Sequence, residues 1–418
     1  MRFCIYTSEH ESLVHEMLNR VVYYLSLGKE IIFLLIWLGV QQYLFIDTLQ
    51  SFHSNSQFAS TNELTGYGVA IAKACAAVIN FNSALLIVSM CQISITALQG
   101  SFLGRLLPFE KYRSMHRLAS LSIVTYSLVH TGAHYYNYAQ IPTNWFLLAF
   151  KTGPGLTGHF LWLSLLVIGG TSWFKWVRRW NFELFWYTHY LALVFLVLLN
   201  FHGAFCFVKR DFAPQCPGAH AWRWLVGPCT LFLLELSIRE WRSRRFTFIS
   251  KVIVHQANVV EIQLKKPSLV FKPGQYVQLN CPEVSFLQWH PFTITSAPEE
   301  GIVSVHVKVV GSWTRQLCSL LGVQFRQDSN ESDGYAAPAQ FPRILLDGPY
   351  GSVSESFDRF DVAICIGAGI GQTPFASILK SMWYSITHPT QTMKLKRIVY
   401  YGLSREVQVS ESPDRPKS

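Results

Sequence analysis

The sequence predicts a multi-domain protein that begins with a six-span α-helical membrane bundle, continues into an antiparallel β-barrel and ends in a partial α/β unit. Three observations support this fold class. Only 14% of the 418 residues are charged, whereas soluble proteins average about a quarter. Apolar segments close to the length that a bilayer core requires recur up to residue 240. Beyond residue 245, short alternating segments and then one βαβ pattern replace them.

The apolar segments are six in number, and the basic residues gather at alternate joints between them. The segments cover residues 30–47, 67–98, 115–138, 157–177, 183–206 and 222–240. The basic residues are Arg105, Lys111 and Arg113 at the second joint, Lys175, Arg178 and Arg179 at the fourth, and Arg239, Arg242, Arg244 and Arg245 at and after the end of the sixth segment. By the positive-inside rule both termini are cytosolic, and an even number of spans agrees with this. We therefore expect a multi-pass protein of the plasma membrane or an endomembrane.

The first 27 residues precede the bundle, which is predicted to cover residues 28–240. They hold the charged side chains Glu9, Glu11, Glu16 and Arg20, and they lack the apolar core and cleavage site of a signal peptide. We expect a cytosolic, partly helical leader here. The net charge of +10 suits nucleic acid or an acidic membrane surface. Because the cations cluster between apolar segments, they favour the lipid bilayer as partner and argue against nucleic acid.

The nine cysteines are scattered and form no CxxC pair. A zinc or iron–sulfur site built from cysteine is therefore not expected. Cys206 and Cys216 lie close together in one predicted loop. A disulfide between them would require that loop to face the outside, and the sequence leaves this question open.

The second half of the chain is predicted to hold two smaller domains. Residues 245–355 contain short alternating segments such as VVEIQLKK and IVSVHVKVV, which are typical of an antiparallel β-barrel. Residues 324–340 are polar and are expected to form a loop. In residues 356–403, the strand DVAICIG, a glycine-rich loop, the helix TPFASILKSMWY and the strand LKRIVYY indicate a βαβ unit. Residues 404–418 are polar and predicted to be disordered.

Two of the apolar segments carry pairs of histidines at similar spacing. His116 and His130 are fourteen residues apart in the third segment, and His189 and His202 are thirteen apart in the fifth. At about 1.5 Å per residue these spacings correspond to about 20 Å along a helix axis. Both segments run from the inside to the outside, so His116 is at the depth of His189 and His130 at the depth of His202. Two imidazoles facing each other commonly ligate a low-spin haem iron, and we expect two such haems.

The fifth segment poses a geometric difficulty for this interpretation. On an ideal helix, His189 and His202 are about 140° out of phase. A π-bulge or a local unwinding would correct this, and the sequence does not choose between them. The alternative is that these histidines only form hydrogen bonds within the bundle. Four histidines at matched depths on two helices of the same direction make that alternative the weaker one.

Two further polar residues stand near the outer histidine pair. His134 follows His130 by one helical turn, and Lys73 lies early in the second segment. A lysine inside a membrane is unfavourable unless it meets an anion, and a haem propionate would serve. Together, the two side chains are candidates for a small polar pocket in which oxygen is reduced. The alternative, in which Lys73 extends to the lipid headgroups, is equally compatible with the sequence.

Motifs in the second half indicate a flavin and a dinucleotide. The stretch HPFTITS (residues 290–296) offers Thr293, Thr295 and nearby backbone to an isoalloxazine edge, and Lys308 in HVKVVGSWT is suited to neutralise a pyrophosphate. In GAGIGQTPF (residues 367–375), glycines between a strand and a helix allow backbone N–H groups to approach a phosphate. A flavin is the standard converter between hydride donors and one-electron haems.

Taken together, these features resemble the catalytic subunit of the NADPH oxidase family. The likeness covers roughly residues 28–403 and depends on the histidine pairs, FWYTH, HPFT, HVKVVGSWT and GAGIGQTPFASILK. It implies a ferric-reductase-like bundle with two b-type haems, followed by a ferredoxin-reductase-like region that binds FAD and NADPH. Electrons would pass from NADPH through FAD and both haems to molecular oxygen and give superoxide or hydrogen peroxide.

The resemblance also assigns residues by motif match. It makes His116, His189, His130 and His202 the haem ligands. It makes His290, Pro291, Phe292, Thr293, His306 and Lys308 contacts of FAD, and Gly367, Gly369, Gly371, Thr373 and Pro374 contacts of NADPH. A small membrane partner subunit is implied in the same way.

The chain departs from the family pattern in two respects. Lys308 and Lys73 stand where the family more often has arginine, so the charge is kept but the bidentate fork is lost, and we expect a weaker hold on the cofactors. Family members continue past the second nucleotide strand, whereas this chain ends at Ser418. We therefore expect a partial NADPH-binding domain, from a splice form or an incomplete gene model, with Arg405 as the residue available to a 2′-phosphate.

Two other functions stay open on the sequence. In the first, the same electron path ends on ferric or cupric ions, as in the related metalloreductases, which also contain HPFT. In the second, the chain binds haem without turnover and sequesters a partner from a full-length oxidase. The short C-terminal domain motivates this second alternative.

Overall fold

The structure is a computed structural model that divides into two compact units, Met1–Leu233 and Leu234–Ser418. It describes residues 9–205, 211, 218, 220–255, 257–325, 332–335, 338–352, 354–355, 357, 360–388 and 395–403. Each unit has its own hydrophobic core. One is built by apolar side chains of helices and the other by side chains of antiparallel strands.

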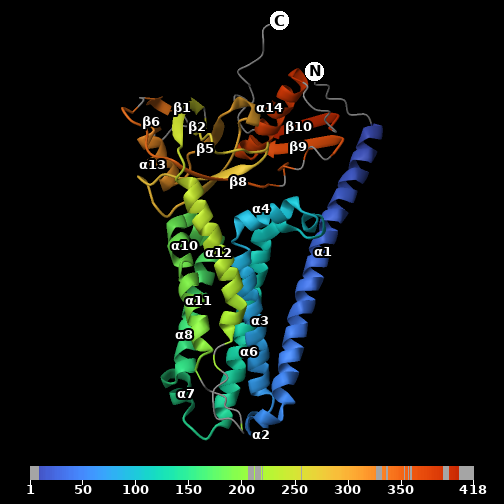
Figure 1. The fold of residues 1–418 in the computed structure, drawn as a ribbon, viewed down its shortest axis with the longest axis vertical. Coiled ribbons are helices and arrows are strands. Elements are labelled where there is room, and N and C mark those ends of the chain that lie inside the picture. Colours follow the sequence, from blue (N-terminus) through green and yellow to red (C-terminus); the bar gives the residue numbers. More distant parts are fainter. Residues whose placement is uncertain are drawn as a thin grey trace. The chain divides into compact units, whose positions relative to one another are not determined.

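The first unit is helical (Figure 1). Its helices are α1 (Glu9–His53), α2 (Ala59–Thr65), α3 (Gly68–Val88), α4 (Gln92–Gly100), α5 (Leu103–Leu106), α6 (Tyr112–Gln140), α7 (Trp145–Lys151), α8 (Gly153–Trp173), α9 (Lys175–Trp180), α10 (Phe182–His189) and α11 (Leu191–His202), with α12 (Ala221–Ser243) running on into the second unit. Single turns of 3₁₀-helix cover Ser56–Phe58 and Phe109–Lys111. The described residues of each of the six predicted apolar segments are largely helical. Residues 89–91 interrupt the second segment, Phe174 the fourth and Tyr190 the fifth.

Four of these helical stretches are long and apolar enough to cross a membrane. They are Leu27–His53, Gly68–Val88, Gly153–Trp173 and Phe182–His202. Within the described residues, α6 and α12 do not meet this criterion of apolar length, since α6 carries three histidines and α12 carries charged side chains such as Glu235 and Arg239. The six predicted spans are thus supported as helices, but apolar length by itself identifies four.

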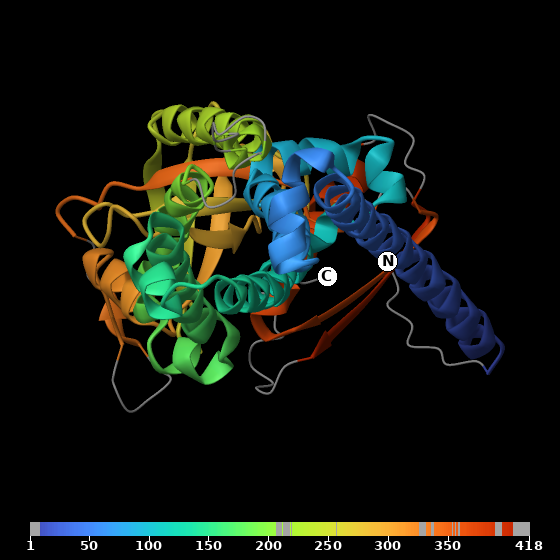
Figure 2. The ribbon, with the colours of Figure 1, turned by 90° about the horizontal axis from the view of Figure 1, so that it is seen from below.

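The leader and the first apolar segment form one continuous helix. α1 begins at Glu9 and continues without a break to His53, so no structural boundary marks residues 27 and 28. Toward its N-terminal end, α1 leans away from α3 (Figures 1 and 2). The predicted partly helical leader is therefore helical from Glu9 onward.

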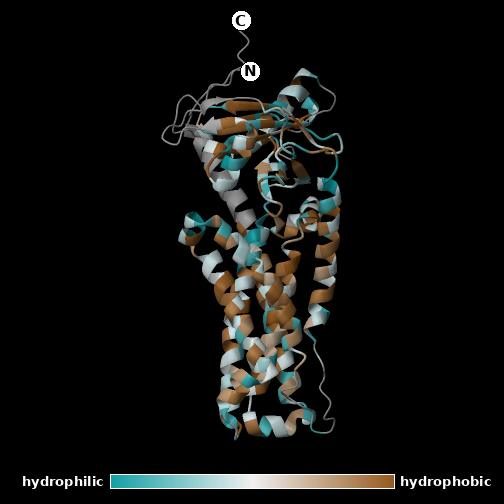
Figure 3. Ribbon diagram, turned by 90° about the vertical axis from the view of Figure 1, so that its left-hand side faces the viewer, coloured by the Kyte–Doolittle hydropathy of each residue, from teal (hydrophilic) through white to brown (hydrophobic). Residues whose placement is uncertain are grey.

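Hydrophobic residues make up much of the long helices of the first unit (Figure 3). Large side chains such as Leu35, Leu166 and Val197 remain more than half exposed. Contiguous apolar surface of this kind suits lipid rather than water. Inside the unit, α3 packs along α6, and α8 packs along α10 and α11.

A buried polar network joins α1, α3 and α6. The Asn82 side chain accepts a hydrogen bond from Trp37 Nε1 at 3.0 Å and donates to Gln41 Oε1 at 3.0 Å and to Ser122 Oγ at 3.1 Å. Asn82 is fully buried, and Gln41 is 2% exposed. Interhelical hydrogen bonds of this type stabilise membrane bundles, because water is not available inside the bilayer as an alternative hydrogen-bond partner.

The described residues of the second unit form four small sheets. Its strands are β1 (Phe248–His255), β2 (Val259–Lys265), β3 (Tyr276–Asn280), β4 (His290–Thr293), β5 (Val303–Lys308), β6 (Val323–Phe325), β7 (Ser332–Tyr335), β8 (Leu345–Tyr350), β9 (Val362–Ala368) and β10 (Arg397–Leu403), and its helices are α13 (Ser312–Leu320) and α14 (Thr373–Thr387). Antiparallel pairing gives the orders β1-β2-β5, β4-β3-β8 and β6-β7, whereas β9 and β10 are parallel.

The predicted closed barrel is not seen among the described residues. Instead, the sheets β1-β2-β5 and β4-β3-β8 enclose one core, and a bridge between Ile294 and Val305 joins them. A second difference concerns residues 324–340, predicted to be a loop, where β6 and β7 pair with each other. The predicted βαβ unit is confirmed, since β9, α14 and β10 follow in order and the two strands run parallel.

Candidate functional site

Two pairs of histidines face each other in the first unit. His116 and His130 lie on α6, while His189 ends α10 and His202 ends α11. The ring centres of His116 and His189 are 6.3 Å apart, and those of His130 and His202 are 6.1 Å apart. We call His116 with His189 the first pair and His130 with His202 the second pair. The structure thus brings together the residues that the sequence matched by depth.

A break between α10 and α11 turns both histidines of this segment toward α6. Tyr190 separates the two helices, and its N–H donates to Tyr187 O at 3.2 Å. Leu193 N–H likewise donates to Tyr190 O at 3.0 Å. These bonds span three residues instead of four, so the helix is locally wound more tightly. The two expectations for this segment, a π-bulge or a local unwinding, are both absent from its described residues 182–205. A break with tighter winding at Tyr190 is present instead, and both histidines face α6.

A neighbouring oxygen engages Nδ1 in both histidines of α6. His130 Nδ1–H donates to the carbonyl of Ala72 at 2.8 Å. His116 Nδ1 lies 2.9 Å from Ser89 Oγ, and that hydroxyl donates to Leu86 O at 2.6 Å. Because the Ser89 proton is used in this way, the hydroxyl accepts from His116. In both rings the proton is therefore on Nδ1, and Nε2 keeps its lone pair.

The partners of these rings, on α10 and α11, are held in the same way by α8. Thr157 Oγ1 donates to Gly153 O at 2.7 Å and accepts from His202 Nδ1 at 2.9 Å. His189 Nδ1 lies 3.3 Å from Ser172 Oγ. Gly158 allows the close approach of α8, since a Cβ at this position would lie 3.3 Å from Cε1 of His202.

The donor set fits a metal ion between the two rings of each pair. Histidines that bind a metal through one nitrogen usually donate the other N–H to a neighbouring oxygen, which orients the ring. Two imidazole nitrogens that bind a metal ion from opposite sides lie about 4 Å apart, since each bond is about 2 Å long, and this separates the ring centres by about 6 Å. Both measured separations agree with this value. Paired axial imidazoles are the ligands of low-spin haem.

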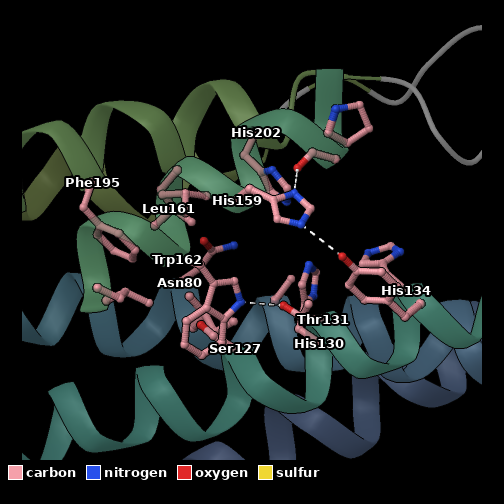
Figure 4. Close-up of a pocket in the computed structure, with 18 of the residues that line it drawn as sticks. Asn80, Ser127, His130, Thr131, His134, His159, Leu161, Trp162, Phe195 and His202 are labelled. Carbon is pink, nitrogen blue, oxygen red and sulfur yellow. Dashed lines mark hydrogen bonds between the residues drawn. The ribbon is translucent and has the colours of Figure 1, made fainter. Parts of the chain in front are cut away.

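A cavity of about 110 Å³ lies beside the second pair (Figure 4). It lies between α3, α6, α8 and α11, and its polar lining includes His134, His159, Tyr135 and Asn80. The ring of His134 is 4.6 Å from that of His130 and nearly perpendicular to it. The candidate oxygen-site residue His134 therefore does line a cavity next to the second pair.

The second candidate of that pocket, Lys73, is placed differently. It lies on α3, and its Nζ stands over the ring of Phe52 at 5.7 Å from the centroid. The residues that line the cavity do not include Lys73. A cation over an aromatic face is stabilised by the ring quadrupole. Lys73 thus contributes its charge near α1 and is not a lining residue of the cavity.

The HPFT stretch forms the whole of β4 in the second unit. This strand pairs with β3, so that His290 lies opposite Leu279 and Thr293 opposite Tyr276. The ring of His290 packs 4.1 Å from that of Trp313 on α13. Burial lowers the pKa of His290 to about 4, so the ring is neutral near pH 7. Pro291 is exposed, whereas Phe292 and Thr293 are half-buried.

Thr295 and His306 contact each other, whereas Lys308 is exposed at the end of β5. Thr295 is only 1% exposed, and its Oγ1 lies 2.9 Å from His306 Nδ1. The other nitrogen of His306, Nε2, lies 3.7 Å from the carboxylate of Glu261. Both ring nitrogens of His306 therefore face protein atoms. Burial lowers the pKa of His306 to about 4, although the nearby Glu261 carboxylate raises it.

The glycine-rich loop lies between β9 and α14 as predicted from the sequence. Gly367 is in β9, while Gly369 and Gly371 belong to a 3₁₀ turn that leads into the helix at Thr373. Gly369 has a φ of +53°, which favours glycine. Thr373 Oγ1 donates to Ile370 O at 2.8 Å, and Pro374 occupies the first turn of α14. The backbone N–H groups at the start of α14 form the kind of site that anions favour.

Three of the predictions concern residues outside the described part of the chain. Arg405, predicted to reach a 2′-phosphate, and the tail of residues 404–418 lie there. The two cysteines of the open disulfide question, Cys206 and Cys216, lie there as well.

Sequence reasoning missed the residues that orient the predicted ligands. Ser89, Thr157 and the carbonyl of Ala72 hold histidine rings, but they come from other helices, and no sequence spacing relates them to those rings. Glu261 is different. The alternation in VIVHQANVVEIQL places His255 and Glu261 on strands of one hairpin, so their proximity was accessible from the predicted register.

Family models match both halves of the chain. The model described as "Ferric reductase like transmembrane component" matches residues 74–200, and the model described as "FAD-binding domain" matches residues 245–354. The first match contains both histidine pairs except His202, and the second contains β4 and β5. The fold and the paired histidines thus define the class of transmembrane flavoprotein oxidoreductases.

Full-length relatives narrow this class to one family. NADPH oxidase 1 of Mus musculus is 32% identical to this chain, and the alignment covers 90% of this chain and 73% of the relative. NADPH oxidase 3 of Homo sapiens is 30% identical, with 93% and 78% covered. A superoxide-generating NADPH oxidase heavy chain of Dictyostelium discoideum is 34% identical, with 92% and 75% covered. The chain belongs to the NADPH oxidase family.

Proposed function

We propose that each histidine pair holds one b-type haem and that the chain uses both haems to carry electrons from NADPH to molecular oxygen across a membrane. Membership of the NADPH oxidase family makes the chain an oxidoreductase with oxygen as electron acceptor. The single observation that carries the haem proposal is that the histidine rings of the two pairs agree in proton position and in the distance between ring centres. In three of them hydrogen bonds place the proton on Nδ1, and the ring centres of both pairs stand about 6 Å apart.

The residues of the chain hold and tune the haem iron in this proposal. FAD and haem, when bound, supply the conversion from hydride transfer to one-electron transfer. The His130 N–H that donates to the Ala72 carbonyl makes its Nε2 a stronger ligand and fixes the ring. Thr157 does the same for His202. The apolar core of the unit, which includes Phe195, keeps the surroundings of the second pair low in dielectric.

We place the reduction of oxygen at the cavity beside the second pair, with superoxide as the product. A polar side chain, His134, faces this cavity and can donate a hydrogen bond to an oxygen species that gains charge. The Lys73 ammonium on α3 would add a positive potential from outside the cavity.

The second unit would bind the two nucleotides. We assign the FAD contacts to His290, Pro291, Phe292 and Thr293 of β4 and to Lys308, with Thr295 and His306 acting in the same region. We assign the NADPH contacts to the loop Gly367–Gly371 with Thr373 and Pro374. The FAD assignment is supported by β4, which is an edge strand with half-buried polar groups. The NADPH assignment is supported by the position of the loop directly before the N-terminus of α14.

The finer topology also belongs to this proposal. Helices at the six predicted positions support six spans. From six spans and the distribution of cations in the sequence, we infer that both termini are cytosolic. The boundaries 28–240, 245–355 and 356–403 divide the chain into haem, FAD and NADPH regions. A small membrane protein is a further expected partner, for which exposed apolar surface is available.

Optical spectroscopy of the full chain tests the haem proposal. The variant His130→Leu removes one ligand of the second pair, so the reduced-minus-oxidised haem absorbance of membranes should fall to about half. The matched control is His159→Leu, which removes a histidine that lines the same cavity but has no ring partner in a pair. It should retain the full absorbance. Equal absorbance in wild type and His130→Leu would contradict the proposal.

The electron acceptor is tested separately. Membranes containing the chain should form superoxide in an NADPH-dependent manner, measured as dismutase-sensitive reduction of a reporter. The same membranes should reduce a ferric chelate more slowly. Dominant ferric-chelate reduction would instead assign the chain to the metalloreductases, and haem without either turnover would identify a non-catalytic chain that modulates a full-length oxidase.

A further inference from the structure

Three metal-ligating side chains meet on one face of the sheet β1-β2-β5. His255 ends β1, Glu261 lies on β2 and His306 on β5. In the register, Glu261 pairs with Ile253 on one side and with His306 on the other. Residues two apart along a strand share a face, so His255 is on the face of Ile253. Three adjacent strands thus each supply one ligand.

The ligand atoms of this cluster are close together. Glu261 Oε2 lies 3.1 Å from His255 Nε2 and 3.7 Å from His306 Nε2. All three ligand atoms lie within 4.8 Å of one another. The two imidazole rings are stacked at 5.2 Å with an interplanar angle of 25°. Ligands around a tetrahedral zinc ion are about 3.3 Å apart, since each metal–ligand bond is about 2 Å. The two measured distances fall on either side of this value.

Surrounding residues orient the ligands from behind. The other carboxylate oxygen of Glu261, Oε1, accepts from Ser304 Oγ at 2.6 Å and from Gln263 Nε2 at 3.0 Å. Thr295 Oγ1 contacts His306 Nδ1 at 2.9 Å. These contacts leave Glu261 Oε2 and His306 Nε2 directed toward each other. Outer partners of this kind are typical of ligands in metal sites.

Within the cluster, Glu261 is at hydrogen-bond distance from His255 but not from His306. His255 Nε2–H can donate to Glu261 Oε2 at 3.1 Å. The 3.7 Å separation between Glu261 and His306 exceeds the length of an N–H···O hydrogen bond. Glu261 is 8% exposed, and a buried carboxylate is unfavourable unless positive charge compensates it. Burial raises the pKa of Glu261, but the hydrogen bonds from His255, Ser304 and Gln263 lower this pKa by more than burial raises it. The carboxyl group is therefore ionised.

We propose that His255, Glu261 and His306 form a binding site for Zn²⁺. Two imidazoles and one carboxylate are a ligand set that zinc commonly uses, with a water molecule or solute as fourth ligand. The fourth position would lie on the side of His255, whose side chain is 39% exposed. All three ligands come from this chain, and one of them, His306, lies in the region that we assign to FAD.

Zinc at this position would join three strands of the sheet. β1 is an edge strand, held on one side only by β2, whereas His306 is on the opposite edge strand, β5. A metal ion that binds the folded sheet but not the unfolded chain raises the free energy of unfolding. Above the dissociation constant, this increase grows with the logarithm of the free metal concentration. Zinc should therefore protect the second unit against unfolding.

Radiometric zinc binding to the full chain tests the site. The chain in lipid nanodiscs, with its haem retained, is treated with a chelator and dialysed against micromolar ⁶⁵Zn²⁺. The variant His255→Gln should lose one bound zinc per chain, or show at least about tenfold weaker binding. The control His388→Gln replaces an exposed histidine of the same unit, after α14. It should bind as much zinc as the wild type.

A second variant and a second measurement exclude misfolding as the cause. Glu261→Gln keeps the side-chain volume and should show the same loss of zinc while the haem spectrum stays unchanged. Zinc X-ray absorption of the wild type should show only nitrogen and oxygen neighbours at about 2.0 Å, with imidazole scattering. Wild-type chain that binds no zinc at micromolar concentration, or zinc that remains fully bound in His255→Gln, would overturn the proposal.

Discussion

The ring of His134 stands 4.6 Å from the ring of His130, nearly perpendicular to it and one helical turn further along α6. Residues four apart lie on the same face of a helix. His130 is paired with His202 at 6.1 Å, while His134 lines the neighbouring cavity. The two histidines therefore have separate tasks in the proposed function: His130 as a haem ligand and His134 as a group that faces oxygen.

The variant His134→Leu should slow superoxide formation without loss of haem. Leucine removes the polar group that faces the cavity, and loss of one donor near a developing charge lowers turnover by about 100-fold. The initial rate of NADPH-dependent superoxide formation, normalised to the haem absorbance of the same membranes, measures this.

Lys73→Met is the informative comparison for this prediction. Because Lys73 does not line the cavity and its Nζ stands over Phe52, its replacement should reduce the rate less than His134→Leu does. If Lys73→Met had the larger effect, the positive potential from α3 would be the main contribution, and the role proposed for His134 would be wrong.

The helices could be predicted from the sequence because their signals are local. Apolar length places α3 and α8, and strand–loop–helix order places β9 and α14. The closed barrel could not be decided in the same way. Alternation predicts strands, but the pairing that closes or opens a sheet depends on non-local contacts. Here the bridge Ile294–Val305 joins the two sheets.

The histidine pairs were predictable, whereas their surroundings were not. Spacing within each segment matches His116 with His189, but it cannot show that Tyr190 interrupts the helix and corrects the phase. The oxygens that hold Nδ1 come from α3, α8 and the residue that follows α3, so only the tertiary packing brings Ser89 or Thr157 to a ring.

The variant Asp347→Asn should destabilise the second unit. Asp347 is 1% exposed and accepts from Arg239 Nε at 2.9 Å and from Arg242 NH2 at 2.7 Å, and Tyr350 also donates to it. Removing its charge leaves two partly buried guanidinium groups without their counterion. The free energy of unfolding should fall by about 3 kcal/mol, because removing one partner of a buried ion pair has an effect of this size. Hydrogen exchange of peptides from β3 and β8 measures the change.

Asp361→Asn provides the control for an exposed ion pair. Asp361 pairs with Lys396 at 3.3 Å, and both side chains are more than half exposed. Surface pairs contribute about 0–1 kcal/mol, so exchange should hardly change. Equal protection in wild type and Asp347→Asn would show that the buried pair does not stabilise the unit.

The variant Gly371→Val should weaken NADPH binding without unfolding the loop. A Cβ at Gly371 meets nothing within 4 Å, and the residue has no positive φ. The new side chain would therefore occupy open space beside the start of α14, where the proposal places a phosphate. The Michaelis constant for NADPH should rise by at least about tenfold, equivalent to about 1.4 kcal/mol. The control Gly311→Ala, also in open space but at the start of α13 instead of α14, should leave the constant unchanged. An unchanged constant in Gly371→Val would argue against the loop as the phosphate site.

The stability of the second unit should decrease as the pH falls from 6.5 to 4. Burial lowers the pKa values of His290 and His306 to about 4 in the folded state, while the unfolded value is about 6.5. Within this window the unfolded chain binds protons that the folded chain does not, so acidification favours unfolding. Each histidine contributes a slope of up to about 1.4 kcal/mol per pH unit. The variant His290→Gln should flatten this slope, measured by hydrogen exchange in the presence of a chelator, whereas His388→Gln should keep it. An identical slope in wild type and His290→Gln would mean that the ring of His290 gains its proton as readily in the folded unit as in the unfolded chain, against its packing on Trp313.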